Sequence, residues 1–223
     1  MIQDSAQKPG RLIVLVGPAG AGKTTLAHRL RDAAPDRRAF SVSHTTRPRR
    51  ANEVDGRDYW FVDRPTFEAL RDRAGFAESA EVHGNLYGTS LAEIARLGEA
   101  GRDALFDIDI LGAHNLWRLF PDRTYLCFLL PPNWAVLVER LTRRGTESDD
   151  TVRRRLRTAR LELQALCDSP APWHLVINDD LEASVVALEA VCADAPQPAS
   201  TGVASHPAVR AFLRDALADA RAA

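Results

Sequence analysis

Lysine is almost missing from this 223-residue chain, where only Lys8 and Lys23 occur and arginine supplies the other basic side chains. The formal net charge of −1 argues against a broad basic surface for nucleic acid or an anionic membrane. The three cysteines are odd in number and unclustered, which favours free thiols in a reducing compartment over a disulfide framework or a zinc site. A secretory leader and long apolar runs are also missing. We therefore expect a cytoplasmic protein with neither a nucleic-acid nor a membrane partner.

One of the two lysines stands in the most informative stretch, which reads GPAGAGKTT over residues 17–25 and follows an apolar run at 11–16. It matches G-x-x-x-x-G-K-[ST], in which backbone N–H groups and a helix N-terminus bind phosphates. In that motif the lysine reaches the outer phosphates and the hydroxyl ligates Mg²⁺. A glycine-rich corner without a ligand is the weaker alternative. We expect ATP phosphates to be bound by Gly17, Pro18, Ala19, Gly20, Ala21, Gly22, Lys23, Thr24 and Thr25.

Strand-like and helix-like segments alternate along most of the chain, which predicts an α/β fold with a central parallel sheet. The strands are expected at 11–16, 40–43, 59–62, 76–82, 86–87, 103–110, 124–130 and 174–178. The helices are expected at 22–35, 65–73, 90–101, 133–141, 151–167 and 181–192. The strand at 103–110 ends in two acids, Asp107 and Asp109, which we expect to face the same way.

The short strands between 43 and 89 interrupt this alternation and predict an inserted lobe. We expect a flexible N-terminus (1–10), a main domain (11–192) and a Pro/Ala/Ser-rich linker (193–206). Residues 207–223 carry apolar side chains at helical spacing. We expect this amphipathic helix to dock on the core or to contact a second subunit.

Beyond the loop, many short motifs occur together in one order. They are SVSHTTR (41–47), Arg50 with Glu53, GRDYWFV (56–62), FAE (76–78), GNLYGT (84–89), DID (107–109), RLTRRG (140–145) and VINDD (176–180). With the loop, this set resembles the guanylate kinases over roughly residues 10–190. The resemblance implies a P-loop NTPase three-layer fold with core segments 11–42, 90–139 and 157–192, a GMP-binding lobe at 43–89 and an arginine-bearing lid at 140–156.

The resemblance also implies that GMP, and with it dGMP, accepts a phosphoryl group from ATP with Mg²⁺ as cofactor. The implied GMP-binding residues are Ser43, Arg47, Arg50, Tyr59, Glu78, Tyr87, Thr89 and Asp109. The implied catalytic residues are Lys23, Arg47, Arg140, Arg144 and Arg155. Thr24 and Asp107 would hold Mg²⁺, partly through water. Asn178 would lie near the adenine of ATP, although a strand-end cap is nearly as well supported.

The proposed contacts make chemical sense. Arginines supply planar donors for a phosphate, and the guanine N1–H and N2–H donors suit a carboxylate such as Glu78. Leu111 and Leu86 depart from the family pattern, which usually has a glutamine and a tyrosine there. Two alternatives stay open: a ribose-bisphosphate kinase on the same fold, and a guanylate-kinase-like interaction module without catalysis. The residues that suit guanine argue against the ribose-bisphosphate kinase, which has no base to recognise. The complete phosphate loop argues against the module without catalysis. The sequence leaves both a monomer and a homodimer open.

Overall fold

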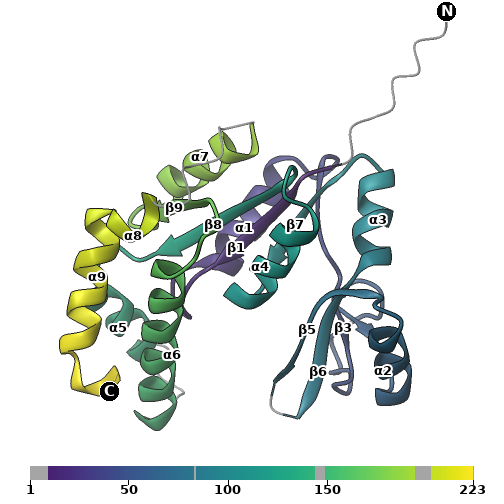
Figure 1. Ribbon diagram of the computed structural model, residues 1–223, viewed down its shortest axis with the longest axis horizontal. Coiled ribbons are helices and arrows are strands. Elements are labelled where there is room, and N and C mark those ends of the chain that lie inside the picture. The colour runs from purple at the N-terminus through teal and green to yellow at the C-terminus, as the bar shows by residue number, and fades with distance from the viewer. Residues whose placement is uncertain (1–9, 83, 144–148, 194–201, 223) are drawn as a thin grey trace, which may run out of the picture.

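A five-stranded parallel sheet forms the centre of the computed structural model, which describes residues 10–82, 84–143, 149–193 and 202–222 (Figure 1). The strand order is β2-β7-β1-β8-β9, and all neighbouring strands are parallel. The strands are β1 (Leu12–Val16), β2 (Arg38–Phe40), β7 (Asp103–Asp107), β8 (Thr124–Leu130) and β9 (Trp173–Ile177). The predicted α/β fold with a parallel sheet is confirmed.

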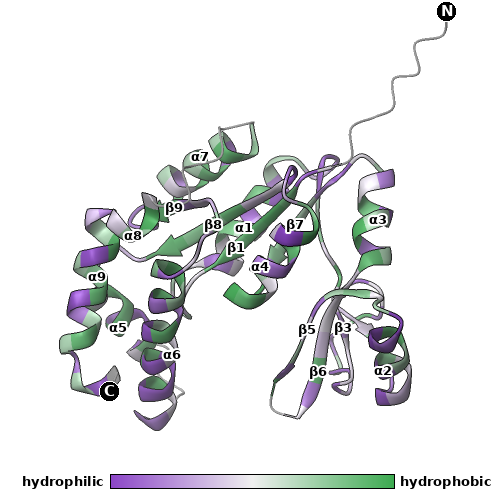
Figure 2. Ribbon diagram, in the orientation of Figure 1, coloured by the Kyte–Doolittle hydropathy of each residue, from purple (hydrophilic) through white to green (hydrophobic). Residues whose placement is uncertain are grey.

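Strand β1 is apolar on both faces because helices cover both sides of the sheet. Ile13 and Leu15 belong to one core, and Leu12 and Val14 belong to the other. The first core is covered by α1 (Lys23–Ala33) and α7 (Leu181–Cys192). The second is covered by α3 (Leu91–Glu99), α4 (Ile110–Leu119), α5 (Trp134–Thr142) and α6 (Asp149–Cys167). Figure 2 shows β1 and β8 as mostly hydrophobic ribbons, as three layers require.

The inserted segment folds into a second, four-stranded sheet with the order β4-β3-β6-β5. Its elements are β3 (His44–Thr45), β4 (Trp60–Phe61), α2 (Arg64–Asp72), β5 (Phe76–Val82) and β6 (Asn85–Ser90). Phe67 of α2 is fully buried and stacks on Phe76 with the ring centroids 4.4 Å apart. The lobe therefore has its own small apolar centre. Figure 1 shows the lobe and helix α6 on opposite sides of the view.

Several predicted strands have other bounds in the structure, and two of these differences lie where the chain enters the site. The strand expected at 40–43 is β2 at Arg38–Phe40, so it begins two residues earlier and shares only Phe40 with the prediction. It does not continue to 43, because the Val42 amide donates to the Glu93 carboxylate instead of extending the sheet. The strand expected at 103–110 ends at Asp107, because Asp109 is the N-cap of α4 and accepts from the Gly112 amide at 2.8 Å. Asp107 and Asp109 therefore do not form a same-face pair within one strand.

The C-terminal helix α9 (Pro207–Ala218) packs on the core, as expected from its apolar spacing. Phe212 is 2% exposed, and its ring meets that of Trp134 edge-on at 5.6 Å. The predicted linker at 193–206 contains a short helix, α8 (Gly202–Ser205), and the chain ends in the 3₁₀ turn η1 (Ala220–Ala222). Residues 194–201, and all of the predicted flexible N-terminus except Gly10, lie outside the described residues.

None of the helices in the described parts of the chain is both long enough and apolar enough to cross a membrane.

Candidate active site

The phosphate loop is built on glycine positions that other residues would not tolerate. Gly17 has φ +145°, and a Cβ there would lie 2.3 Å from the Leu129 carbonyl oxygen. Gly22 has φ +95° and is the N-cap of α1, where no side chain caps the helix. The first N–H groups of α1 are therefore available to an anion, and the helix dipole adds positive potential there. This geometry fits the predicted binding of phosphate.

Asn178 supports the backbone of the phosphate loop. Its side-chain amide donates to the Ala21 carbonyl at 2.8 Å, and its backbone carbonyl accepts from the Arg140 guanidinium at 3.0 Å. A Cβ on Gly22 would lie 2.2 Å from Asn178 Nδ2, so the two residues are closely fitted. The sequence placed Asn178 near the adenine or at a strand end. The structure shows a buried side chain that follows β9 and holds the loop's backbone.

Lys23, Thr24 and Asp107 meet at the carboxyl edge of the parallel sheet. The Lys23 ammonium donates to the Gly17 carbonyl at 2.6 Å and lies 4.0 Å from an Asp107 carboxylate oxygen. The Thr24 hydroxyl donates to the other Asp107 oxygen at 3.1 Å. A hydroxyl beside a carboxylate suits Mg²⁺, which usually binds few protein groups and completes its shell with phosphates and water. In the described residues no group of three or more His, Cys, Asp or Glu side chains could hold a metal alone.

Glu78 lies on β5 of the lobe, beside the first turn of α4. One of its carboxylate oxygens accepts from the Thr89 amide at 2.9 Å. Burial raises the pKa of Glu78, nearby Asp109 raises it further, and the Thr89 hydrogen bonds oppose this shift. Gly112 allows the first turn of α4 to pack against Glu78, since a Cβ there would lie 3.3 Å from the carboxylate. Glu78 is thus a held carboxylate with one oxygen bound to the protein's own backbone.

Arg47 is held in place by Glu53. Its guanidinium makes two hydrogen bonds to the Glu53 carboxylate, at 2.6 and 3.1 Å, and lies 5.4 Å from the centre of the Tyr59 ring. The pairing raises the pKa of Arg47 and lowers that of Glu53. The Tyr59 and Tyr87 rings lie edge-on with centroids 6.0 Å apart. A fixed, charged guanidinium beside two phenols can bind a phosphate dianion.

A single cleft of about 320 Å³ brings the lobe, the loop and the sheet edge together. It is lined by Ser43, Tyr59, Glu78 and Tyr87, by Gly17, Lys23, Asp107 and Asp109, and by Glu162 of α6. Arg47, Arg50 and Thr89 do not line it: Arg47 is paired with Glu53, Arg50 is exposed, and Thr89 is buried with its amide bonded to Glu78. The structure therefore joins most of the predicted base-binding residues to the lysine of the phosphate loop.

The predicted lid arginines lie on the other side of the loop. Arg155 of α6 lines a cavity of about 320 Å³ together with Gly20, Lys23 and Thr24. Arg140 lines a neighbouring cavity with Gly20 and Gly22. Arg144 lies outside the described residues. Positive charge on this side faces the place where the outer phosphates of a bound nucleotide would lie.

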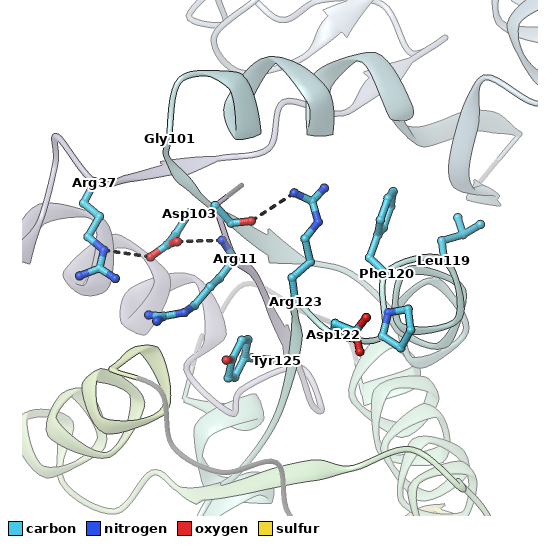
Figure 3. Close-up of a pocket in the computed structure, with 11 residues that line it drawn as sticks. Arg11, Arg37, Gly101, Asp103, Leu119, Phe120, Asp122, Arg123 and Tyr125 are labelled. Carbon is cyan, nitrogen blue, oxygen red and sulfur yellow. Dashed lines mark hydrogen bonds and ion pairs between the residues drawn. The ribbon is translucent and has the colours of Figure 1, made fainter. Parts of the chain in front are cut away.

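A larger cavity, of about 640 Å³, lies at the opposite end of the sheet (Figure 3). Several of its charged side chains are bonded within the cavity wall. Asp103 accepts from the Arg11 amide at 2.8 Å and pairs with Arg37 at 3.3 Å, while Arg123 donates to the Gly10 carbonyl at 3.3 Å. None of the predicted site residues lines it, so its size does not make it the active site.

Comparison with known proteins agrees with this geometry. The family model described as "Guanylate kinase" matches residues 9–195. This chain belongs to the guanylate kinase family. A guanylate kinase of Corynebacterium efficiens is 47% identical over 190 residues, covering 84% of this chain and 97% of the relative. A guanylate kinase of Oleidesulfovibrio alaskensis is 51% identical over 177 residues, covering 78% of this chain and 82% of the relative. The crystal structure of guanylate kinase from Anaplasma phagocytophilum matches with a TM-score of 0.62 and 26% identity, covering 97% of each chain.

Three residues of this guanylate-kinase-family site received no role from the sequence. Glu53 was noted only for its spacing from Arg50, yet its carboxylate holds Arg47. Arg143 lines the cavity beside Gly20 and Gly22 with Arg140. Glu162 lines the central cleft. Glu162 follows Arg155 by two helical turns, so helical periodicity could have placed both on one face.

Proposed function

We propose that the protein transfers the γ-phosphoryl group of ATP to GMP, and to dGMP, forming the nucleoside diphosphate and ADP. Such a reaction recycles GMP within purine nucleotide metabolism. The observation that carries this proposal is the cleft in which Glu78 and Lys23 lie together. The Glu78 carboxylate suits guanine and the Lys23 ammonium suits phosphate. One cavity can therefore hold the acceptor nucleotide and the outer phosphates of the donor.

In this reaction a phosphate oxygen of GMP forms a bond to the γ-phosphorus, and the bond from that phosphorus to the β–γ bridging oxygen breaks. Arg47, Arg50, Tyr59 and Tyr87 would bind the acceptor phosphate. Glu78 would accept from guanine N1–H and N2–H, with Ser43, Thr89 and Asp109 completing the base contacts. Such paired polar contacts discriminate strongly against a base with the opposite pattern.

On the donor side, the loop backbone would bind the ATP phosphates and Lys23 would reach toward the transferred group. Arg140, Arg144 and Arg155 would offset charge on that group, since phosphoryl transfer depends chiefly on positioning and electrostatic stabilisation. Thr24 and Asp107 would hold Mg²⁺, which supplies further charge neutralisation when bound. Asn178 would act on the donor through the loop that it supports.

The test is an assay of ADP release by purified protein with Mg²⁺ and ATP, run against GMP, dGMP, AMP, UMP, CMP and ribose 1,5-bisphosphate. We expect turnover with GMP and dGMP and at most a small fraction of that rate with the other acceptors. ADP release with ribose 1,5-bisphosphate but not with GMP would contradict the proposal. Hydrolysis of ATP at a rate that no acceptor increases would also contradict it.

A further inference from the structure

Glu162 is an acidic side chain in the central cleft for which the proposed reaction has no role. It lies on α6 and lines the cleft that also contains Lys23, Asp107 and Asp109. Arg155 precedes it by seven residues, so the two side chains leave the helix on nearly the same face. One face of α6 therefore presents an arginine to the phosphate loop and a carboxylate to the cleft.

The Glu162 carboxylate lies in an unfavourable environment. Its Oε2 atom is inaccessible to solvent and has no hydrogen-bond partner in the described part of the chain. Burial raises its pKa; Asp109 and Asp107 raise it further, and only Lys23 acts in the opposite direction. Glu162 as a whole is partly buried, but a carboxylate oxygen that is buried without a hydrogen bond destabilises a fold. Packing does not account for it, because Leu163 and Leu166 of the same helix already fill the core.

The charge around Glu162 calls for a cation. The carboxylates of Glu162, Asp107 and Asp109 line one cleft with the ammonium group of Lys23, and Lys23 already donates to Gly17. The acids do not form a cluster that could chelate a metal by themselves. A hydrated divalent ion held near Thr24 and Asp107 fits both facts, since Mg²⁺ keeps several of its waters when it binds with nucleotide phosphates.

We propose that Glu162 is a positioning residue that couples helix α6 to the metal–nucleotide complex. Its carboxylate accepts hydrogen bonds from water on Mg²⁺ bound near Thr24 and Asp107. Arg155, on the same helix face, is thereby drawn toward the phosphates when the metal is present. The inference rests on the proposed donor site but not on the identity of the acceptor.

The test compares the wild-type protein with Glu162→Gln, a variant of the same shape without the charge. Binding of a non-hydrolysable ATP analogue is measured by calorimetry without GMP, once with Mg²⁺ and once with EDTA. We expect the increase in affinity due to Mg²⁺ to fall about tenfold in the variant, which corresponds to about 1.4 kcal/mol. Affinity without metal should equal or exceed that of the wild type, because a negative charge has been removed from the site.

Asp168→Asn is the matched control. Asp168 is an exposed acid just after α6, and its neutralisation should change neither affinity. Glu162→Asp, which keeps the charge on a shorter side chain, should recover part of the metal-dependent increase. The melting temperature of Glu162→Gln at neutral pH should be no lower than that of the wild type.

Several results would overturn the proposal. An equal loss with and without Mg²⁺ would mean that Glu162 acts through Lys23 or the fold, and unchanged affinities would mean that it has no part in donor binding. A melting temperature lowered by several degrees would indicate a structural carboxylate. Failure of the wild type to phosphorylate GMP would refute the proposed acceptor and leave this comparison intact.

Discussion

Replacing Glu78 with glutamine tests how the cleft recognises its acceptor. In the structure one Glu78 oxygen accepts from the Thr89 amide at 2.9 Å, and a glutamine carbonyl can keep that bond. The glutamine –NH₂ would then point where guanine presents N1–H and N2–H, so donors would face donors. Hydrogen bonds to a charged group contribute about 1.5–3 kcal/mol each. We expect GMP binding to weaken by about 3 kcal/mol, or roughly 150-fold.

Binding of an ATP analogue should change less than twofold in the same variant, because Glu78 lies on β5 of the lobe and the proposed place of the donor phosphates is the loop. Calorimetry with each nucleotide separately measures both values. Glu81→Gln is the matched control: Glu81 is on the same strand but exposed, and its loss should leave both affinities unchanged. Equal losses for GMP and the ATP analogue in Glu78→Gln would refute the assigned role, as would retention of full GMP affinity.

The pKa of Glu78 adds a pH signature to this prediction. Burial raises that pKa above the usual 4.5, and the base contact requires the ionised form. GMP affinity of the wild type should therefore fall as the pH is lowered through the raised value, at a higher pH than for an ordinary glutamate. Because the folded state favours the protonated carboxyl, its stabilising effect is present at low pH and is lost as the pH rises through the folded pKa. Glu78→Gln should thus be no less stable than the wild type at neutral pH, and its GMP affinity should lose this pH dependence.

Three further predictions follow from the loop and the C-terminal helix. Lys23→Met should reduce ADP release by at least about 100-fold through lost transition-state charge stabilisation, while calorimetry shows GMP affinity within about twofold; an active variant would contradict the assignment. Asn178→Ala leaves the Ala21 carbonyl without its partner, so urea unfolding should show a loss of about 1–3 kcal/mol together with weaker binding of the ATP analogue; unchanged ATP binding would mean that the loop does not need this support. Phe212→Ala should lower the free energy of unfolding by about 3 kcal/mol, whereas Leu217→Ala, at a 54% exposed position, should cost under about 0.5 kcal/mol; similar costs would mean that α9 is not docked in solution.

Much of the fold could be predicted because its signals are local. Residues 124–130 and 181–192 were assigned correctly, since an apolar run before two prolines and a helical pattern after Asp180 are complete within a few residues. The ends of β2 and β7 could not be read the same way. Phe40 ends its strand because the next part of the chain bonds to Glu93, and Asp107 ends its strand because Asp109 caps α4. Glu93 takes a backbone amide that would extend the first strand, and the cap at Asp109 begins a helix where the second strand would continue.

In the site, too, local features could be predicted and contacts between distant residues could not. By itself the sequence determined the phosphate loop, the alternation of strands and helices, and the set of motifs shared with guanylate kinases, because each is written in a few neighbouring residues. Only the tertiary structure decided which side chains meet. The Asn178 amide donates to the Ala21 carbonyl, 157 positions away, and the Arg47 guanidinium pairs with Glu53. Glu162 shares a cleft with Lys23 and Asp107. Those contacts depend on how α6, the lobe and the sheet edge pack, and burial and charge at a point in space are set by all of these elements together.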